Sequence, residues 1–135
     1  MPEIAVGGRS MSVAQMSRDR VRTINVASDF TRTPGGRTKR NGPFNGVQFR
    51  TEVLEPALRQ MPGEYTKLVV NLDGVDTYIG SFLEESFGGL LRGLYDTFEE
   101  AAERLEIRAT GEFEVFRDLA YQYMRDQDKR NAKGR

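Results

Sequence analysis

The 135-residue chain contains no cysteine and no histidine. These absences exclude disulfides, thiolate nucleophiles, zinc sites built from Cys and His, and any Ser-His-Asp triad. A general base acting near neutral pH would have to be a carboxylate, lysine or tyrosine with a shifted pKa. The usual catalytic side chains are therefore absent, although enzyme chemistry remains possible and oxygen ligands could still hold Mg²⁺. We expect a protein that is not an enzyme and that carries no cofactor or metal ion.

Long apolar runs are also missing. No stretch approaches the length needed to cross a bilayer, and residues 1–19 contain no apolar signal region. The sequence therefore predicts a cytoplasmic protein that does not enter a membrane. Its content of 38% apolar and 30% charged residues is typical of globular proteins, and its length fits one domain.

The charges balance overall but are unevenly distributed. Residues 17–50 contain eight basic and two acidic side chains, whereas residues 64–106 contain ten acidic and three basic ones. Two oppositely charged regions can steer a charged partner, or they can be solvated faces that attract each other.

Hydrophobic periodicity predicts three strands and four helices. Alternating or continuous apolar residues predict strands over 22–27, 66–72 and 105–110, and the middle one has the composition of a buried central strand. Apolar residues three or four apart predict helices over 46–60, 81–94, 97–104 and 112–127. The order predicts a single α/β domain over residues 21–127, with helices packed on a mixed or parallel sheet. Residues 1–20 would form an N-terminal arm and residues 128–135 a polar tail that frays.

The carboxyl ends of strands are where sites gather in such sheets. The loop 31–45 and the turn 73–81 are predicted to lie there. Asp73 and Asp76 in this turn could bind Mg²⁺ with Glu84 or Glu85, or could simply stabilise the turn.

The start of the helix after this turn has the pattern of a capping box. Ser81 would cap the helix and Glu84 would reach back to it, which needs no function. A helix N-terminus also favours a bound or covalent phosphate, although Glu84 and Glu85 would repel one. Within the same predicted helix, the pair Gly88-Gly89 predicts close approach of another backbone, either a neighbouring helix of the same chain or a helix of a partner.

The loop 31–45 contains a candidate anion site. Gly35 and Gly36 could present converging N–H groups, with Arg37 and Asn45 beside them. The spacing is not that of a nucleotide-binding P-loop, and a simple turn is the alternative. Nucleic-acid binding through the basic residues of this loop and Phe44 is not favoured, because one aromatic residue and few charges support it.

Several of these segments together resemble a known pattern. Residues 68–90 (LVVNLDGVDTYIGSFLEESFGGL) are similar to the core of STAS domains, which resemble bacterial anti-sigma-factor antagonists. The resemblance is closer to an uncharacterised bacterial family described as STAS-like. It extends over about residues 21–110 through Gly35-Gly36-Arg37, through Asn45-Gly46 with Phe49-Arg50, and through the block from Ser81 to Leu90.

This resemblance implies a STAS-like fold and a regulatory, protein-binding role. In the antagonist domains, a serine at this helix start is phosphorylated by an anti-sigma factor with an ATPase-type kinase fold, which switches binding off. The matching residue is Ser81, preceded by Gly80 instead of Asp and followed by Phe82. Partner binding is then expected around Gly80, Ser81, Phe82, Glu84 and Glu85, and the partner would be an ATPase-fold serine kinase or an anti-sigma-like protein. The alternative from the residues themselves is a protein that binds a small anion or nucleotide.

Overall fold

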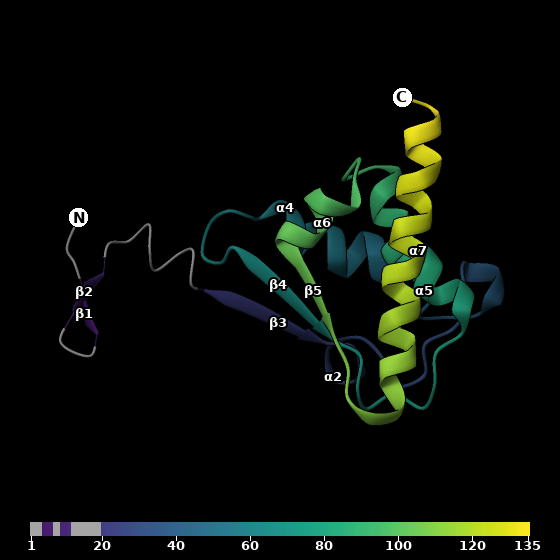
Figure 1. The fold of residues 1–135 in the computed structure, drawn as a ribbon. Helices are drawn as coiled ribbons and strands as arrows, with labels where there is room; N and C mark the ends of the chain where they lie inside the picture. Colours follow the sequence, from purple (N-terminus) through teal and green to yellow (C-terminus); the bar gives the residue numbers. More distant parts are fainter. Residues whose placement is uncertain (1–3, 7–8, 12–19) are drawn as a thin grey trace.

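The computed structural model describes residues 4–6, 9–11 and 20–135. Its main body is a parallel sheet surrounded by helices and helical turns, as Figure 1 shows. The elements in chain order are β1 (Ile4–Val6), β2 (Arg9–Met11), β3 (Val21–Asn25), α2 (Val26–Asp29), η1 (Lys39–Asn41), α3 (Gly46–Gln48), η2 (Phe49–Leu54), α4 (Glu55–Arg59), β4 (Lys67–Asn71), α5 (Gly80–Phe87), η3 (Gly88–Arg92), α6 (Phe98–Arg104), β5 (Leu105–Arg108), η4 (Gly111–Phe113) and α7 (Glu114–Lys133).

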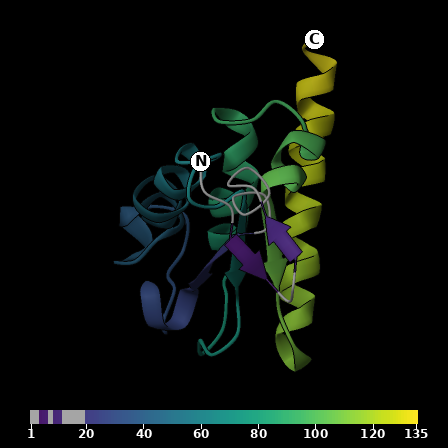
Figure 2. The same cartoon turned by 90° about the vertical axis from the view of Figure 1, so that its left-hand side faces the viewer.

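The sheet has the order β3-β4-β5, and both pairings are parallel. Val69 of β4 lies in register with Thr23 on one side and Glu106 on the other. Leu68, Val69 and Val70 are almost completely buried, which confirms the predicted central strand. Figure 2 shows α7 beside the β5 side of the sheet and residues 26–59 beside the β3 side. The predicted α/β class is therefore confirmed.

The N-terminal strands are not part of this sheet. β1 and β2 pair antiparallel in a two-stranded sheet of their own. The predicted arm over residues 1–20 otherwise lies mostly outside the described residues.

The helix predicted over 46–60 is present as three consecutive segments. Its middle segment, η2, is π-helical, and the Glu55 N–H donates to the carbonyl of Arg50, five residues back. The π-helical stretch ends directly before α4, which carries Pro56 in its first turn. Proline has no N–H group, so this position makes no backbone hydrogen bond of the helix. Pro56 therefore follows a change of helical pitch without ending the helix.

The second helix begins earlier and ends sooner than predicted. Ile79 is the N-cap of α5, and the Phe82 N–H donates to the Ile79 carbonyl. The predicted capping box is wrong, because Ser81 is the second residue of the helix and not its cap. The Glu84 carboxylate lies against arginines instead of returning to the helix start.

The last helix is longer than predicted, and residues 128–133 belong to it. The Asn131 amide donates to the carbonyls of Leu91 at 2.8 Å and Asp96 at 2.9 Å. These two bonds tie the last turns of α7 to the segment around η3. The expected fraying at 128 is therefore not observed, because the polar side chains there have acceptors on the body of the domain.

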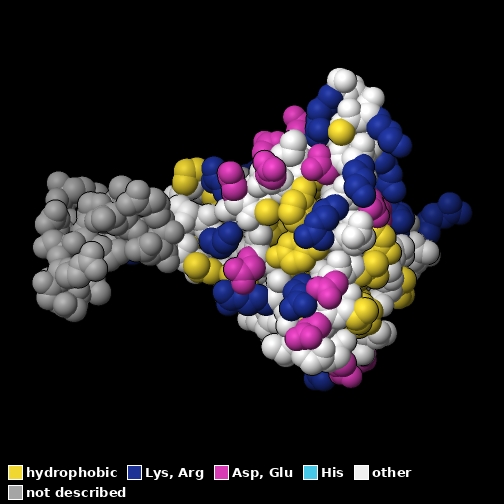
Figure 3. All heavy atoms as spheres, in the orientation of Figure 1, with side chains coloured by type: hydrophobic (Ala, Val, Ile, Leu, Met, Phe, Trp, Pro, Cys, Tyr) yellow, Lys and Arg dark blue, Asp and Glu magenta, His cyan; other side chains and the backbone are white. Residues whose placement is uncertain are grey.

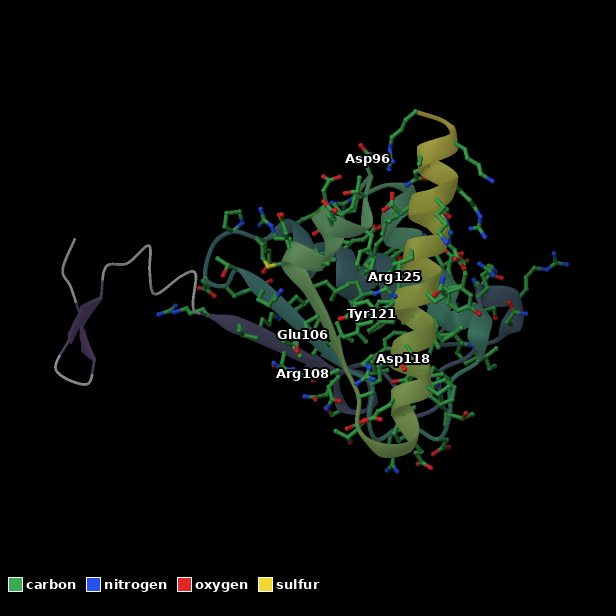
Figure 4. The ribbon with its side chains drawn as sticks, viewed as in Figure 1. Asp96, Glu106, Arg108, Asp118, Tyr121 and Arg125 are labelled. Carbon is green, nitrogen blue, oxygen red and sulfur yellow. The ribbon has the colours of Figure 1, made fainter. Side chains whose placement is uncertain are left out.

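α7 also covers the outer edge of β5. The Ile107 N–H donates to the Tyr121 hydroxyl at 2.8 Å, and the Arg125 guanidinium lies over the Phe98 ring, 4.7 Å from its centroid. Figure 4 shows Tyr121 and Arg125 on the side of α7 that faces β5. Figure 3 shows apolar side chains gathered along the same junction. Burial raises the pKa of Tyr121, so its hydroxyl stays protonated at neutral pH.

The contact between α3 and α5 depends on a glycine. A Cβ added to Gly46 would lie 2.8 Å from the Glu85 Cβ and 2.9 Å from the Phe82 carbonyl oxygen. Both neighbours belong to α5, so an alanine there would force the two segments apart.

We expect Gly46→Ala to lower the free energy of unfolding by about 1 to 3 kcal/mol, the usual cost of overpacking. Urea unfolding followed by circular dichroism measures this loss. Gly134→Ala is the matched control, because its Cβ would meet only an ordinary contact of 3.7 Å with the Asn131 carbonyl oxygen. Equal unfolding midpoints for the two variants would show that the contact has more room than the structure indicates.

Candidate functional site

The loop 31–45 and helix α5 lie together, as the sequence predicts. Arg37 from the loop donates to Glu84 and, at 3.3 Å, to Glu85, both on α5. The Arg37 side chain is 41% exposed, whereas the two carboxylates are mostly buried. Arg37 is therefore the outermost link between the two segments.

These ion pairs belong to a larger arginine–glutamate cluster. The cluster consists of three arginines and three glutamates from the loop, η2, α4, α5 and η3: Arg37, Arg50, Glu55, Glu84, Glu85 and Arg92. Arg50 is its inner member, since it pairs with Glu55 and Glu85 at 2.9 Å each and also donates to the Glu85 carbonyl at 3.2 Å. Arg92 pairs with Glu84 at 2.7 Å and donates to Gln127 of α7 at 2.9 Å. The cluster thereby joins the loop, η2, α4, α5 and η3, and Arg92 connects it to α7.

The pKa of Glu84 depends on two opposing effects, burial and the neighbouring arginines. Burial acts to raise the pKa of this carboxyl group, but hydrogen bonds and charges from Arg92 and Arg37 outweigh it. The net result is a pKa below the ordinary value of 4.5. Glu84 is therefore held as a carboxylate at neutral pH.

The pair Gly88-Gly89 makes room for the cluster. A Cβ on Gly89 would lie 2.6 Å from Arg50 Nε, and one on Gly88 would lie 2.8 Å from Glu84 Oε2. The same Gly88 Cβ would lie 3.5 Å from the Tyr123 carbonyl oxygen of α7. The predicted close approach is present within the chain, but it involves charged side chains more than backbone. The pair also lies in the 3₁₀ turn η3 and not inside an α-helix.

Two of the residues predicted to contact a partner differ in accessibility. Ser81 is half-buried, and within the described residues its hydroxyl has no hydrogen-bond partner. Phe82 is completely buried and stacks on Phe49 with ring centroids 5.7 Å apart. The prediction of Phe82 as a contact residue is therefore wrong, because its ring belongs to the core. Ile79, just before α5, is instead 49% exposed.

Most groups of the candidate anion site already have partners. The Gly35 N–H donates to the Phe44 carbonyl at 3.0 Å. The Asn45 side chain accepts from the Gln48 N–H at 2.9 Å and donates to the Gly42 carbonyl at 3.4 Å. These bonds make the loop compact, and Arg37 is occupied by carboxylates. Anion binding stays a prediction that would require Arg37 to leave Glu84 and Glu85.

Polar side chains near the carboxyl ends of the strands form hydrogen bonds that link neighbouring segments. Asp73 accepts from the Thr110 N–H at 2.8 Å and from its hydroxyl at 2.6 Å. The Asn71 amide donates to Asn25 Oδ1 at 3.1 Å. Asp73 therefore ties the end of β4 to the segment after β5, and these two bonds do not lie within its own turn. Among the described residues, no three acidic side chains are grouped so that they could hold a metal ion.

Sequence reasoning missed the cluster as a unit. Glu84 and Glu85 were predicted at this surface, and Phe49-Arg50 entered through the family resemblance. Arg92 and Gln127 had no detectable signal, since they are 35 residues apart in the chain and meet only through the packing of η3 on α7. Only a known fold places them together.

The parallel α/β fold and the Ser81–Leu90 segment together define a STAS-like domain. A model of the STAS-like domain of unknown function (DUF4325) matches residues 45–112, which is half of the chain. The chain belongs to this family. The match includes α3, the cluster residues of η2 and α4, all of β4, α5 and η3, and β5. No curated protein and no solved structure matches the chain.

None of the helices in the described part of the chain combines the length and the apolar character that a membrane span needs.

We expect Arg50→Ala to destabilise the fold by about 2 to 3 kcal/mol, because Glu55 and Glu85 would be left mostly buried without their cation. The Arg50 side chain is 20% exposed, so the cost should stay below that of a fully buried pair. Arg108→Ala is the control, since the Arg108–Glu106 pair lies at the surface and should contribute at most about 0.5 kcal/mol. Urea unfolding compares them, and equal losses would contradict a structural role for the cluster.

The lowered pKa of Glu84 also predicts how stability changes with pH. A carboxyl group whose folded-state pKa is depressed stabilises the fold fully above its unfolded-state pKa, and this contribution is lost as pH falls through the folded-state value. The free energy of unfolding should therefore fall on acidification below about pH 4.5 more steeply for the wild type than for Glu84→Gln. Urea unfolding at a series of pH values, with Glu112→Gln as an exposed control, measures the difference. Parallel pH profiles for wild type and Glu84→Gln would show that Glu84 is not the responsible group.

Proposed function

We propose that this domain is a regulatory protein-binding module that acts without catalysis. Its partner docks on the surface shared by the loop 31–45 and the start of α5. The observation that carries this proposal is the Arg37 bridge to Glu84 and Glu85, which makes one surface out of the two segments. The exposed Ile79 adds apolar area beside it.

Ser81 is the switch residue in this proposal. Residues three and four apart share a helix face, so Ser81 lies one turn before Glu84 and Glu85. A phosphate on Ser81 would be favoured by the N-terminus of α5 and repelled by the two carboxylates. Arg37 is the exposed cation of the cluster and can exchange these carboxylates for the phosphate. Modification of Ser81 would then release the loop from its present position and change the surface that the partner contacts.

Two further considerations support this proposal. The membership in a STAS-like family favours binding over catalysis, and the resemblance to antagonist domains favours an ATPase-fold serine kinase or an anti-sigma-like protein as the partner. The charged groups at the site are paired with one another, which suits a surface that changes shape by exchanging ion pairs. The protein would act in the cytoplasm, where such kinases operate.

The proposal predicts that Ser81→Asp reduces recovery of the partner at least tenfold in a quantitative pull-down from a native lysate, whereas Ser81→Ala retains it. The added carboxylate would compete for Arg37 and repel Glu84 and Glu85. Ser28→Asp on α2 is the control, because it adds the same charge at an exposed serine of another helix.

Thermal unfolding of each bait shows that the variants are folded. If Ser81→Asp and Ser28→Asp recover the same proteins in the same amounts as wild type, Ser81 does not control binding.

A further inference from the structure

The outer side of α3 and η2 carries an open groove of about 620 Å³. Its walls are mostly carbon and come from the loop and from the helix that follows: Thr38, Lys39, Pro43, Asn45, Val47, Gln48, Thr51 and Glu52. The groove is separate from the arginine–glutamate cluster, none of whose members lines it. Part of its wall is the π-helical stretch, and such stretches often occur at functional sites.

Phe44 lies between two of the groove residues and has an unusual conformation. Its φ is 54°, in the left-handed region that residues other than glycine rarely adopt, and the residue is 41% exposed. One edge of the ring packs on Phe30, with centroids 5.4 Å apart. A strained backbone and an exposed aromatic ring both cost stability, and this combination is typical of residues retained for binding.

The loop around Phe44 is held in one shape. Thr38 and Asn41 form a capping box around η1, and the N–H groups of Gly46 and Val47 donate to the carbonyls of Gly36 and Arg37. These bonds fix both walls of the groove before any ligand arrives. A preorganised surface loses less entropy on binding.

The charge of this surface has one sign over a long stretch of chain. Between Asp29 and Glu52 there is no acidic residue at all. Arg37 and Arg50 in this stretch are paired within the cluster. The remaining three cations are Arg32, Lys39 and Arg40, all exposed and without an ion pair in the described residues. Glu52 is the acidic side chain among the residues that line the groove, and the three exposed cations outnumber it. The surface therefore has a net positive charge that complements an acidic partner.

We propose that the loop 31–45 and the adjoining groove bind a short acidic segment of a partner protein that carries an apolar side chain. Lys39 and Arg40 bind its carboxylates, and the apolar side chain occupies the groove wall formed by Pro43 and Val47, with Phe44 beside it. This inference rests on the proposed function and specifies the chemistry of the partner.

The test is selection of a random 12-residue peptide library on phage against the immobilised full chain. Enriched peptides should combine Asp or Glu with a neighbouring aliphatic or aromatic residue. An enriched peptide, labelled and followed by fluorescence anisotropy, should bind at least tenfold more weakly to the double variant Lys39→Glu/Arg40→Glu. Lys129→Glu/Lys133→Glu on α7 makes the same charge change elsewhere and should leave binding unchanged.

Phe44→Asn separates binding from folding. Asparagine tolerates the left-handed conformation, so the unfolding midpoint should stay within a few degrees of wild type while peptide affinity falls severalfold. If this variant does not fold, the charge-reversal pair decides alone. The proposal is overturned if no peptide is enriched, if the enriched peptides are not acidic, or if both charge-reversed variants bind equally.

A nucleic acid or a second copy of this chain could occupy the groove instead, and each would give a distinct experimental result. A labelled single-stranded oligothymidine that binds more tightly than the peptides and depends on Phe44 would identify a nucleic-acid surface and overturn the proposal. Concentration-dependent dimerisation abolished by Lys39→Glu/Arg40→Glu would identify a second copy of this chain and also overturn it. Peptide binding to the purified chain needs neither Ser81 nor the native partner, so failure here is distinct from failure of the Ser81 switch.

Discussion

The contact between Arg50 and Glu85 is the interaction on which the rest of the arrangement depends. Arg50 comes from the π-helical stretch and Glu85 from α5, so their pairing joins two helical segments that pack together. Burying either charge alone would cost several kcal/mol, and each is tolerated only because the other is present with good geometry. The glycines at 46 and 89 fit this arrangement, because any side chain there would collide with Glu85 or Arg50.

The arginines of the cluster differ in burial, from the mostly buried Arg50 to the more exposed Arg37. Arg50 makes three hydrogen bonds and is mostly buried, whereas Arg37 is 41% exposed and is the only member from the loop. Exposed ion pairs contribute little to stability, and buried ones resist change. The inner part therefore fixes the packing of α5, and the outer part can exchange partners at small cost. A surface that must respond to a modification without unfolding needs both properties.

Much of the fold could be predicted from the sequence because its signals are local. The apolar run of β4 and the alternation of β5 predicted that both segments are strands with buried side chains. The helix predicted over 97–104 is α6, which begins at a capping box formed by Thr97 and Glu100. The capping-box prediction at Ser81 failed because a tertiary constraint outweighed the local pattern. Tyr78 is buried, its hydroxyl donates to the Leu72 carbonyl at 2.7 Å, and the chain must begin its helix directly afterwards.

The site was predictable only in part for the same reason. The carboxyl ends of the strands predicted that the loop with Arg37 and the turn before Ser81 lie together, and the ion pairs join Arg37 to Glu84. The partners of these residues come from elements distant in sequence, and no local periodicity connects Arg92 to Gln127 or Arg50 to Glu85. The π-helical stretch was likewise invisible, since its apolar spacing differs little from that of an α-helix over six residues.

Helix α7 covers the outer edge of β5, so the β5 edge of the sheet is closed to pairing with a further strand. The Tyr121 hydroxyl accepts the Ile107 N–H, so an incoming strand would have to displace a whole helix to pair there. β3 is the opposite edge strand of the sheet, and its Asn25 N–H donates to the Asp29 carboxylate at 2.7 Å. Edge-to-edge association through β5 is thus blocked by the helix that follows this strand in the chain.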